Sequence, residues 1–506
     1  MPKKKLLPKK KLLLTYPNWR WEKSDIMTTW NLSPYILCLL ASMVKEDVEV
    51  KIIDSQFYNL SIEEFMKQVE EFAPDYVGIS ILTSEYESTL DITAAAVKEW
   101  NNETIVIAGG VHVSIEYKRV IQNQNIDYAV RGEGEYVLQG LIRYLNGTSD
   151  LLPKEGLVFR KNGEIIIQEH TLIEDLTALP WPDLSLVKME DYLSTEARNG
   201  PLRAPEYPSL RWVVTRGCPV GCSFCQVEFI SGRNVRARDP EDVVNELIFM
   251  KERYGLKSII FEDDNISLPR KFFMRMLELF IEKELNLKFI HNSFAIFTLN
   301  EDMLDLMARA GCQGLNVAIE TGNQRVMKEV VMKPVTLSRI PSKIKKIQEK
   351  GLFVIANFIV GYPGEKWDEI LDTVRFAEHC GADYIKIFVA VPLKGTKMWD
   401  LAIHLNALEP SEDNYRVDWR YGQIRSDEWT SKDISILRAY EWDRINFGTP
   451  SRRKRVAEIW GLSVDEMGEI RKRTRDSLNF DANLVSNATP QLLLGKESER
   501  TETPVA

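Results

Sequence analysis

Three cysteines that stand close together constrain this chain more than any other feature. Cys218, Cys222 and Cys225 lie in the segment Cys-Pro-Val-Gly-Cys-Ser-Phe-Cys. A 4Fe-4S cluster held by three thiolates keeps one iron open, and a cofactor can occupy that iron. The alternative, a structural zinc site, requires four closed ligands that usually come as two pairs, and no further Cys or His pair lies near these cysteines. The spacing therefore predicts an iron–sulfur cluster.

The cysteine motif resembles the signature of radical S-adenosylmethionine (SAM) enzymes, in which an aromatic residue, here Phe224, precedes the last cysteine. In that family SAM chelates the open iron, and an electron from the cluster cleaves it to a 5′-deoxyadenosyl radical. The resemblance implies that Cys218, Cys222 and Cys225 hold the cluster and that Phe224 lies beside the cofactors. It also implies a low-potential electron donor of the flavodoxin or ferredoxin type.

The composition agrees with an intracellular enzyme of several domains. The chain has 506 residues, which is long for a single core, and 44% of them are hydrophobic. Only six cysteines are present, and three of them share one octapeptide, which is not a disulfide framework. Because thiolate ligands need reducing conditions, we expect a cytoplasmic protein.

The N-terminus and the net charge bear on the partners. Six lysines among the first eleven residues precede an apolar stretch, residues 12–14, that is too short for a signal-peptide core. We expect residues 1–11 to form a mobile basic tail, with a lipid or nucleic-acid contact as the alternative. The longest apolar helix candidate, residues 35–44, is far short of a membrane span. The formal net charge of −9 disfavours nucleic acid as a partner.

Residues 12–150 alternate short apolar runs with amphipathic segments, which predicts strands and helices in strict alternation. Such a pattern is typical of an α/β, doubly wound, Rossmann-like domain with a parallel sheet. Its ligand site lies beyond the carboxyl ends of the strands. The expected strands are residues 11–15, 48–54, 76–80, 104–108 and 127–131.

Most of the residues that end or follow these strands are small or polar, with one leucine among them. They are Ser80, Leu82, Gly109, Gly110, His112, Gly132 and Glu133. Glycine lets a backbone approach a bulky ligand, although an ordinary strand-to-helix turn would also use it. The Ser-x-Leu and Gly-Gly pair resembles cobalamin-binding domains, and the segment 131–135, Arg-Gly-Glu-Gly-Glu, resembles the cobalamin-binding branch of the radical SAM family. The resemblance implies that these residues bind cobalamin.

One feature of many cobalamin domains is missing from this chain. Their Asp-x-His-x-x-Gly motif places a histidine beneath the cobalt, but no histidine precedes His112 here. The chain therefore resembles the class that binds the corrin with its nucleotide base displaced and no histidine below. His112 is either a substitute cobalt ligand or a hydrogen-bonding loop residue.

Residues 205–400 contain six further strand–helix units, with strands expected at 212–215, 258–261, 288–293, 314–319, 353–360 and 383–388. They resemble the partial (β/α)6 barrel of radical SAM enzymes, whose chemistry lies at the carboxyl ends of the strands. Residues 151–204 are expected to be a linker. Residues 401–482 are predicted to form a helical C-terminal cap, and residues 483–506 a disordered tail.

The barrel resemblance gives four candidate residues for contacts with SAM. Asp263 or Asp264 stands where the wider family often has Gly-Gly-Glu for the SAM amino group, and the alternative is a helix N-cap. Glu320 is expected to contact SAM, with a barrel salt bridge as the alternative. The turn at Gly361 is expected to pack along the adenosine.

The sequence thus predicts a cobalamin-dependent radical SAM enzyme that methylates an unactivated carbon of a small molecule. In such enzymes one SAM methylates cobalamin and a second yields the radical. A cyclase or rearrangement enzyme with the same cofactors is an alternative, because fold does not fix the substrate. A non-enzymatic cobalamin sensor would not need the cysteine triad, and the acidic chain disfavours an RNA methylthiotransferase.

Overall fold

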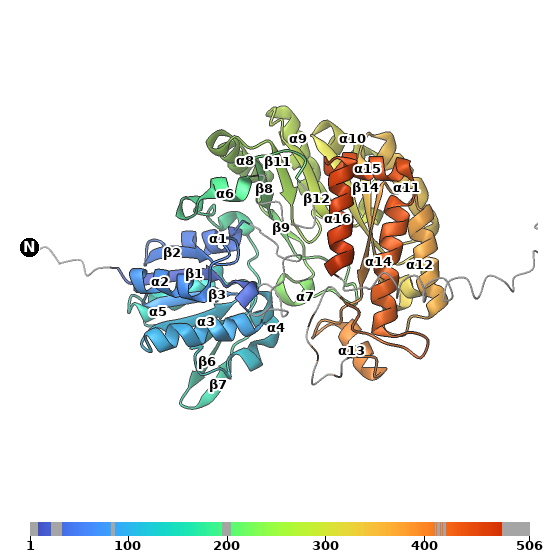
Figure 1. Cartoon of the computed structure of the whole chain (residues 1–506). Helices are drawn as coiled ribbons and strands as arrows, with labels where there is room; N and C mark the ends of the chain where they lie inside the picture. The colour runs from blue at the N-terminus through green and yellow to red at the C-terminus, as the bar shows by residue number, and fades with distance from the viewer. Residues whose placement is uncertain are drawn as a thin grey trace, which may run out of the picture.

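The structure of the chain is a computed structural model with two lobes (Figure 1). It describes residues 9–21, 33–81, 87–194, 204–409, 411, 415, 417 and 421–477. For residues 473–477 it describes the backbone alone. The N-terminal lobe is blue to teal, and the larger lobe is green to red. Two short elements, β9 (Thr215–Arg216) and α7 (Val227–Ile230), lie where the lobes meet.

The first lobe is built on a seven-stranded sheet in the order β2-β1-β3-β4-β5-β6-β7. Its first five strands are parallel, which confirms the predicted doubly wound sheet. The order β2-β1-β3-β4-β5 places the switch point of the winding between β1 and β3. These strands are β1 (Lys11–Tyr16), β2 (Glu49–Asp54), β3 (Tyr76–Ser80), β4 (Ile105–Gly109) and β5 (Tyr128–Val130).

Helices cover both faces of this sheet because successive side chains of a strand point to opposite sides. Leu12 and Leu14 pack in one core cluster with α1 and α5, whereas Leu13 packs in another with α2, α3 and α4. The helices are α1 (Tyr35–Val44), α2 (Ile62–Phe72), α3 (Glu87–Trp100), α4 (Val111–Val120) and α5 (Glu135–Leu145).

The expected linker, residues 151–204, is not entirely a linker. Strands β6 (Leu157–Lys161) and β7 (Glu164–Ile167) form a hairpin that extends the first sheet antiparallel to β5. The pairing of Val130 with Leu157 supplies the backbone hydrogen bonds that this short segment needs. Helix α6 (Met189–Leu193) follows, and Tyr192 donates a hydrogen bond to Asp54 at the end of β2 (3.0 Å).

The second lobe contains a six-stranded parallel sheet in the order β15-β14-β13-β12-β11-β8, which confirms the partial barrel. Its strands are β8 (Ser209–Trp212), β11 (Ser258–Phe261), β12 (Lys288–Phe294), β13 (Cys312–Glu320), β14 (Phe353–Val360) and β15 (Tyr384–Val389). The outer helices are α8 (Pro240–Tyr254), α9 (Arg270–Glu282), α10 (Glu301–Arg309), α11 (Ile340–Glu349) and α12 (Trp367–His379).

Helices after the barrel cover its open edge. Asn446 of α14 accepts from the Ile385 N–H and donates to the Ile385 C=O (both 2.8 Å), so it satisfies backbone groups that an edge strand would otherwise leave unpaired. The helical C-terminal region expected at 401–482 is formed by α13 (Lys397–His404), α14 (Ser431–Phe447), α15 (Pro450–Trp460) and α16 (Val464–Ser477). The predicted tail at 483–506 lies outside the described residues, as do residues 1–8 of the basic tail.

A continuous apolar core joins the lobes. One cluster of buried side chains includes Leu37 of α1 and Trp212 of β8, and the rings of Tyr35 and Trp212 lie 4.7 Å apart, edge to face. Within the described ranges, no helix combines the length and apolarity needed to cross a bilayer.

Candidate active site

The cysteine loop begins at the end of β9, where the lobes meet. Gly217 adopts φ +93°, and a Cβ there would lie 2.4 Å from the carbonyl oxygen of Asn234, so the turn into Cys218 requires glycine. Burial raises the pKa of all three thiols, that of Cys222 to about 12 and that of Cys225 to about 11. Each apo thiol is therefore neutral near pH 7, and cluster binding must release its proton.

The two aspartates after β11 brace the chain that leads to the cysteines. Asp263 Oδ1 accepts hydrogen bonds from the N–H of Val214 (2.9 Å) and from the N–H (2.5 Å) and hydroxyl (2.7 Å) of Thr215. Asp264 Oδ2 accepts from the Gly217 N–H (3.0 Å). Burial raises the pKa of Asp263 to about 7. Neither is the N-cap of α9, and contact with the SAM amino group stays a prediction for both.

Glu320, at the end of β13, forms the salt bridge that the sequence left open as an alternative. Its Oε1 lies 2.7 Å from Lys333 Nζ, and Lys333 also donates to the Ala318 carbonyl (2.7 Å). Both side chains are buried, and Glu320 adopts φ +79°, a strained conformation for a residue with a side chain. Such strain is found most often at functional sites. Whether Glu320 also contacts SAM stays a prediction.

Lys333 is a candidate functional residue that sequence reasoning missed. It follows a π-helix, Val326–Val331, whose last residue accepts a hydrogen bond from the Ser223 N–H of the cysteine loop (3.0 Å). The charge of Lys333 acts to lower the pKa of Cys222 and Cys218 against the larger effect of burial. The local sequence carries no signal for this role, because the contact joins a helix end to a distant loop.

The turn after β14 is held by a buried carboxyl group. Glu365 Oε2 accepts from the N–H groups of Gly361 (2.8 Å) and Tyr362 (2.9 Å), and burial raises the pKa of Glu365 to about 8. Gly361 adopts φ +82°, and a Cβ there would lie 2.8 Å from Ile434 of α14. The Phe224 ring lies 6.4 Å from the ring of Tyr362, so the cysteine loop and this turn are neighbours. Contact of Gly361 or Phe224 with SAM stays a prediction.

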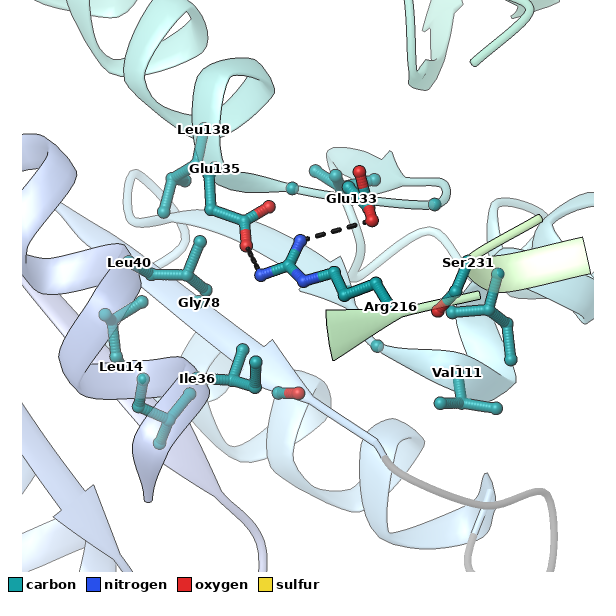
Figure 2. Close-up of a pocket in the computed structure, with 18 of the residues that line it drawn as sticks. Leu14, Ile36, Leu40, Gly78, Val111, Glu133, Glu135, Leu138, Arg216 and Ser231 are labelled. Carbon is teal, nitrogen blue, oxygen red and sulfur yellow. Dashed lines mark hydrogen bonds and ion pairs between the residues drawn. The ribbon is translucent and has the colours of Figure 1, made fainter. Parts of the chain in front are cut away.

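A cavity of about 290 Å³ opens at the carboxyl edge of the first sheet (Figure 2). Both lobes line it: Ile36 and Leu40 of α1 face it from one side, and Arg216 and Ser231 from the other. It includes five of the predicted cobalamin residues, namely Ser80, Gly109, Gly110, Gly132 and Glu133. Of the other two, Leu82 lies outside the described residues.

Gly109 ends β4 and Gly110 follows it, and the two positions require glycine for different structural reasons. A Cβ on Gly109 would meet no atom within 4 Å, so its missing side chain leaves open space along the cavity. Gly110 adopts φ +97°, and a Cβ there would lie 2.5 Å from the Ile81 carbonyl oxygen. Gly132 adopts φ +68° and donates its N–H to Ser114 Oγ (2.9 Å). Of these three glycines, only Gly109 has no backbone or steric reason to be glycine, so the open cavity beside it is the remaining reason.

His112 is not among the described residues that line this cavity. It is buried in the first turn of α4 and faces a smaller cavity with Glu87 and Lys394. Its Nε2 lies 3.8 Å from a carboxylate oxygen of Glu87, and neither ring nitrogen has a hydrogen-bond partner within the described part of the chain. Burial lowers the pKa of His112 to about 4, with smaller effects of Arg119 and Lys394. His112 is therefore a helix residue rather than the expected loop residue, and its ring makes no hydrogen bond to the residues that the structure describes.

The residues present fit the groups that the sequence predicts. Three half-buried thiols stand on a braced loop, and the glycine-lined cavity is mainly aliphatic where α1 meets the sheet. Among the described residues, no three Cys, His, Asp or Glu side chains converge on one metal ion. In a cubane cluster, each thiolate binds a different iron.

Comparisons with known proteins agree with this arrangement. The model of the radical SAM superfamily matches residues 212–377, and that of the B12 binding domain matches residues 31–142. An uncharacterised methyltransferase of Pyrococcus horikoshii is 30% identical over 411 residues, 80% of this chain and 85% of that protein. The cytidylyl-2-hydroxyethylphosphonate methyltransferase of Streptomyces wedmorensis is 28% identical over 435 residues, 80% of each protein.

A solved structure shares the fold of both lobes. The cobalamin-dependent SAM radical enzyme OxsB, with aqua-cobalamin and SAM bound, superposes with a TM-score of 0.68 at 16% identity, over 97% of this chain and 75% of that one. Fold and site together define a radical SAM enzyme with a cobalamin-binding domain. The chain belongs to the cobalamin-dependent radical SAM methyltransferase family, and its cofactors are a 4Fe-4S cluster, SAM and cobalamin.

The protein's own contribution to the chemistry follows from these contacts. When bound, the cluster supplies the electron that cleaves SAM, and cobalamin carries the methyl group. Cys218, Cys222 and Cys225 would hold the cluster, while Asp263 and Asp264 fix the loop that bears them. Cobalamin would occupy the cavity between the lobes, where aliphatic side chains exclude water from the reacting groups.

Proposed function

We propose that this enzyme transfers a methyl group to an unactivated carbon of a small molecule and consumes two SAM molecules per product. The observation that carries the proposal is the shared cavity: the cobalamin lobe and the barrel both line it, and the cysteine loop begins at its rim. A substrate that binds between cobalamin in this cavity and the cysteine loop would face both cofactors. Pockets between domains are the usual location of small-molecule sites.

Polar side chains inside the barrel support a polar substrate. Arg211 alternates along β8 with Leu210 and Trp212, which pack beneath the helices, so Arg211 points into the barrel. It pairs with Glu262, which also lines the shared cavity and accepts a hydrogen bond from Asn292 Nδ2 (2.7 Å).

Two further carboxamides line the same face. Asn316 Oδ1 and Asn357 Oδ1, on β13 and β14, are buried and have no hydrogen-bond partner among the described residues. Buried acceptors are rarely left unpaired, so a ligand with N–H or O–H donors is expected to bind them. The polar face therefore favours a hydrophilic small molecule over a purely apolar one.

We also propose that the enzyme acts in the cytoplasm, because its cysteine ligands need reducing conditions. A flavodoxin or ferredoxin would supply the low-potential electron. A nucleic-acid substrate is disfavoured by the net charge of −9.

The test supplies SAM with a labelled methyl group, a low-potential reductant and candidate polar substrates under anaerobic conditions. We expect label in the product and one S-adenosylhomocysteine and one 5′-deoxyadenosine per methylated molecule. Formation of 5′-deoxyadenosine with a true substrate, but without label in the product, would contradict methyl transfer.

That second outcome would favour a cyclase or rearrangement enzyme. The anaerobic magnesium-protoporphyrin IX monomethyl ester cyclase of Rubrivivax gelatinosus is 26% identical to this chain over 385 residues. The two functions differ in the fate of the methyl group, so the label distinguishes them directly.

A further inference from the structure

Four charged side chains meet in the interface between the lobes. Glu133 and Glu135 come from the first lobe, and Arg216 and Arg236 from the second (Figure 2 shows the first three). The side chains of both glutamates are 4% exposed, and those of Arg216 and Arg236 are 13% and 6% exposed. Two carboxylates and two guanidinium groups thus form an electrically neutral, buried cluster, which we call the interlobe cluster.

Glu133 is the centre of the interlobe cluster. Its two oxygens lie 2.8 Å each from the two terminal nitrogens of Arg236, which is the bidentate geometry that arginine forms with carboxylates. Glu133 Oε1 also lies 3.2 Å from Arg216 Nη1, and Arg216 Nη2 donates to Glu135 Oε1. In Figure 2 the guanidinium of Arg216 lies between the two glutamates.

The arginines connect this cluster to the cysteine loop. Arg216 and Arg236 are paired residues of the two-stranded sheet β9–β10 (β10, Arg236–Ala237), and Gly217 and Cys218 follow Arg216 directly. Arg236 also donates to the carbonyl of Ser231 (2.7 Å), at the end of α7. The cluster therefore holds both ends of the segment that carries the three cysteines.

The glutamates connect the same cluster to the cobalamin side. Glu133 follows Gly132, and both residues and Glu135 line the shared cavity. Glu133 also accepts a hydrogen bond from the N–H of Ile173 (2.6 Å), which ties down the segment between the lobes. Movement of the first lobe against the cysteine loop would break several charge-assisted bonds at once.

Adhesion alone does not explain this arrangement. Buried ion pairs pay a desolvation cost that offsets most of their attraction, and apolar residues of similar volume hold surfaces together as well. The apolar core that joins the lobes already supplies adhesion. Planar guanidinium groups also fix the relative orientation of the two lobes, because a bidentate pair tolerates little displacement.

We infer that Glu133 and Glu135 are positioning residues that set the distance and orientation of the cluster loop relative to the cobalamin cavity. This inference rests on the proposed function, in which one substrate must face both cofactors. The resemblance assigned Glu133 to cobalamin binding, which stays a prediction, and the side chain of Glu133 also forms the contact between the lobes. A displacement of about 1 Å between reacting groups lowers a rate by about 10²-fold.

The test compares Glu133→Gln with wild type in the holoenzyme. We expect iron and cobalamin contents near those of wild type, and product methylation reduced by about 10²-fold. Pulsed electron paramagnetic resonance of the reduced cluster and cob(II)alamin should give a shifted or broader distribution of inter-spin distances. Arg216→Lys keeps the charge but loses the fork, so it should change the distances in the same sense.

Two further variants keep the test decisive. Glu135→Gln removes one contact of Arg216 and replaces Glu133→Gln if that variant does not fold. Asp47→Asn is the control, because Asp47 and Arg143 form a 3.0 Å pair within the first lobe, away from the interface. It should leave cofactor contents, methylation and distances unchanged.

An unchanged distance distribution in both glutamine variants would overturn the inference. So would a loss of either cofactor in proportion to activity, because it would show that the glutamates only maintain a binding site. The inter-spin distance needs no substrate, so it decides the positioning role even if methyl transfer itself proves wrong.

Discussion

Replacing Gly109 and Gly110 separately by alanine should distinguish an effect on cobalamin binding from an effect on backbone conformation. The two residues are adjacent at the end of β4, and both were predicted to bind cobalamin. Gly110 adopts φ +97° and ψ −175°, a region that is essentially restricted to glycine. A Cβ there would lie 2.5 Å from the oxygen and 2.9 Å from the nitrogen of Ile81. Gly109 has neither constraint.

The magnitudes follow from those distances. For Gly110→Ala, the disallowed conformation costs about 1–3 kcal/mol and the overlap with rigid backbone costs a similar amount, so we expect a loss of roughly 2–6 kcal/mol of stability. Gly109→Ala should stay within about 0.5 kcal/mol of wild type. Its new methyl group occupies the cavity, however, and should weaken cobalamin binding by about tenfold or more, equivalent to about 1.4 kcal/mol.

Two measurements check this pair. Urea unfolding of the apo proteins, followed by circular dichroism, gives the change in midpoint at constant slope. Anaerobic titration with hydroxocobalamin, followed by absorbance, gives the dissociation constant. Wild-type cobalamin affinity in Gly109→Ala would show that this cavity is not the cobalamin site. Wild-type stability in Gly110→Ala would refute the backbone argument.

Three other predictions follow from the buried groups of the structure. Cys218→Ala should abolish the cluster after anaerobic reconstitution, whereas Cys312→Ala should keep full iron and sulfide content, because Cys312 is buried away from the loop. Lys333→Met leaves Glu320 buried without its partner and should cost about 3–5 kcal/mol in urea unfolding; an unchanged midpoint would contradict the pairing. The pKa of His112 is lowered to about 4 from its usual 6.5, so the folded state binds fewer protons and stability should fall as the pH drops from 6.5 to 4. His112→Leu should remove up to about 3 kcal/mol of this pH dependence, and parallel unfolding curves of variant and wild type would refute it.

Local patterns in the sequence were sufficient for the architecture. The five parallel strands of the first lobe and the six of the barrel each overlap their predicted runs, because buried parallel strands are short, apolar and separated by amphipathic helices. The spacing of Cys218, Cys222 and Cys225 was informative for a similar reason, since the ligands of one cluster come from a single short loop.

Those local patterns did not predict contacts between segments that are distant in the sequence. The hairpin β6–β7 lies in the expected linker, because a four- or five-residue strand is recognisable only next to the edge of β5 that it completes. The salt bridge of Glu320 could not be identified before Lys333, 13 residues later, was placed beside it.

The sequence by itself determined the fold, the cofactors and the place of the cysteines, because each depends on residue types at short, regular spacing. Only the tertiary structure decided what the polar side chains do. In the structure Asp263 accepts a hydrogen bond from the backbone of Thr215, and His112 lines the smaller cavity instead of the shared one. Glu133 forms ion pairs with Arg216 and Arg236. The physical reason is that a charged side chain binds the partner that folding brings within about 3 Å, and chain separation carries no information about that distance.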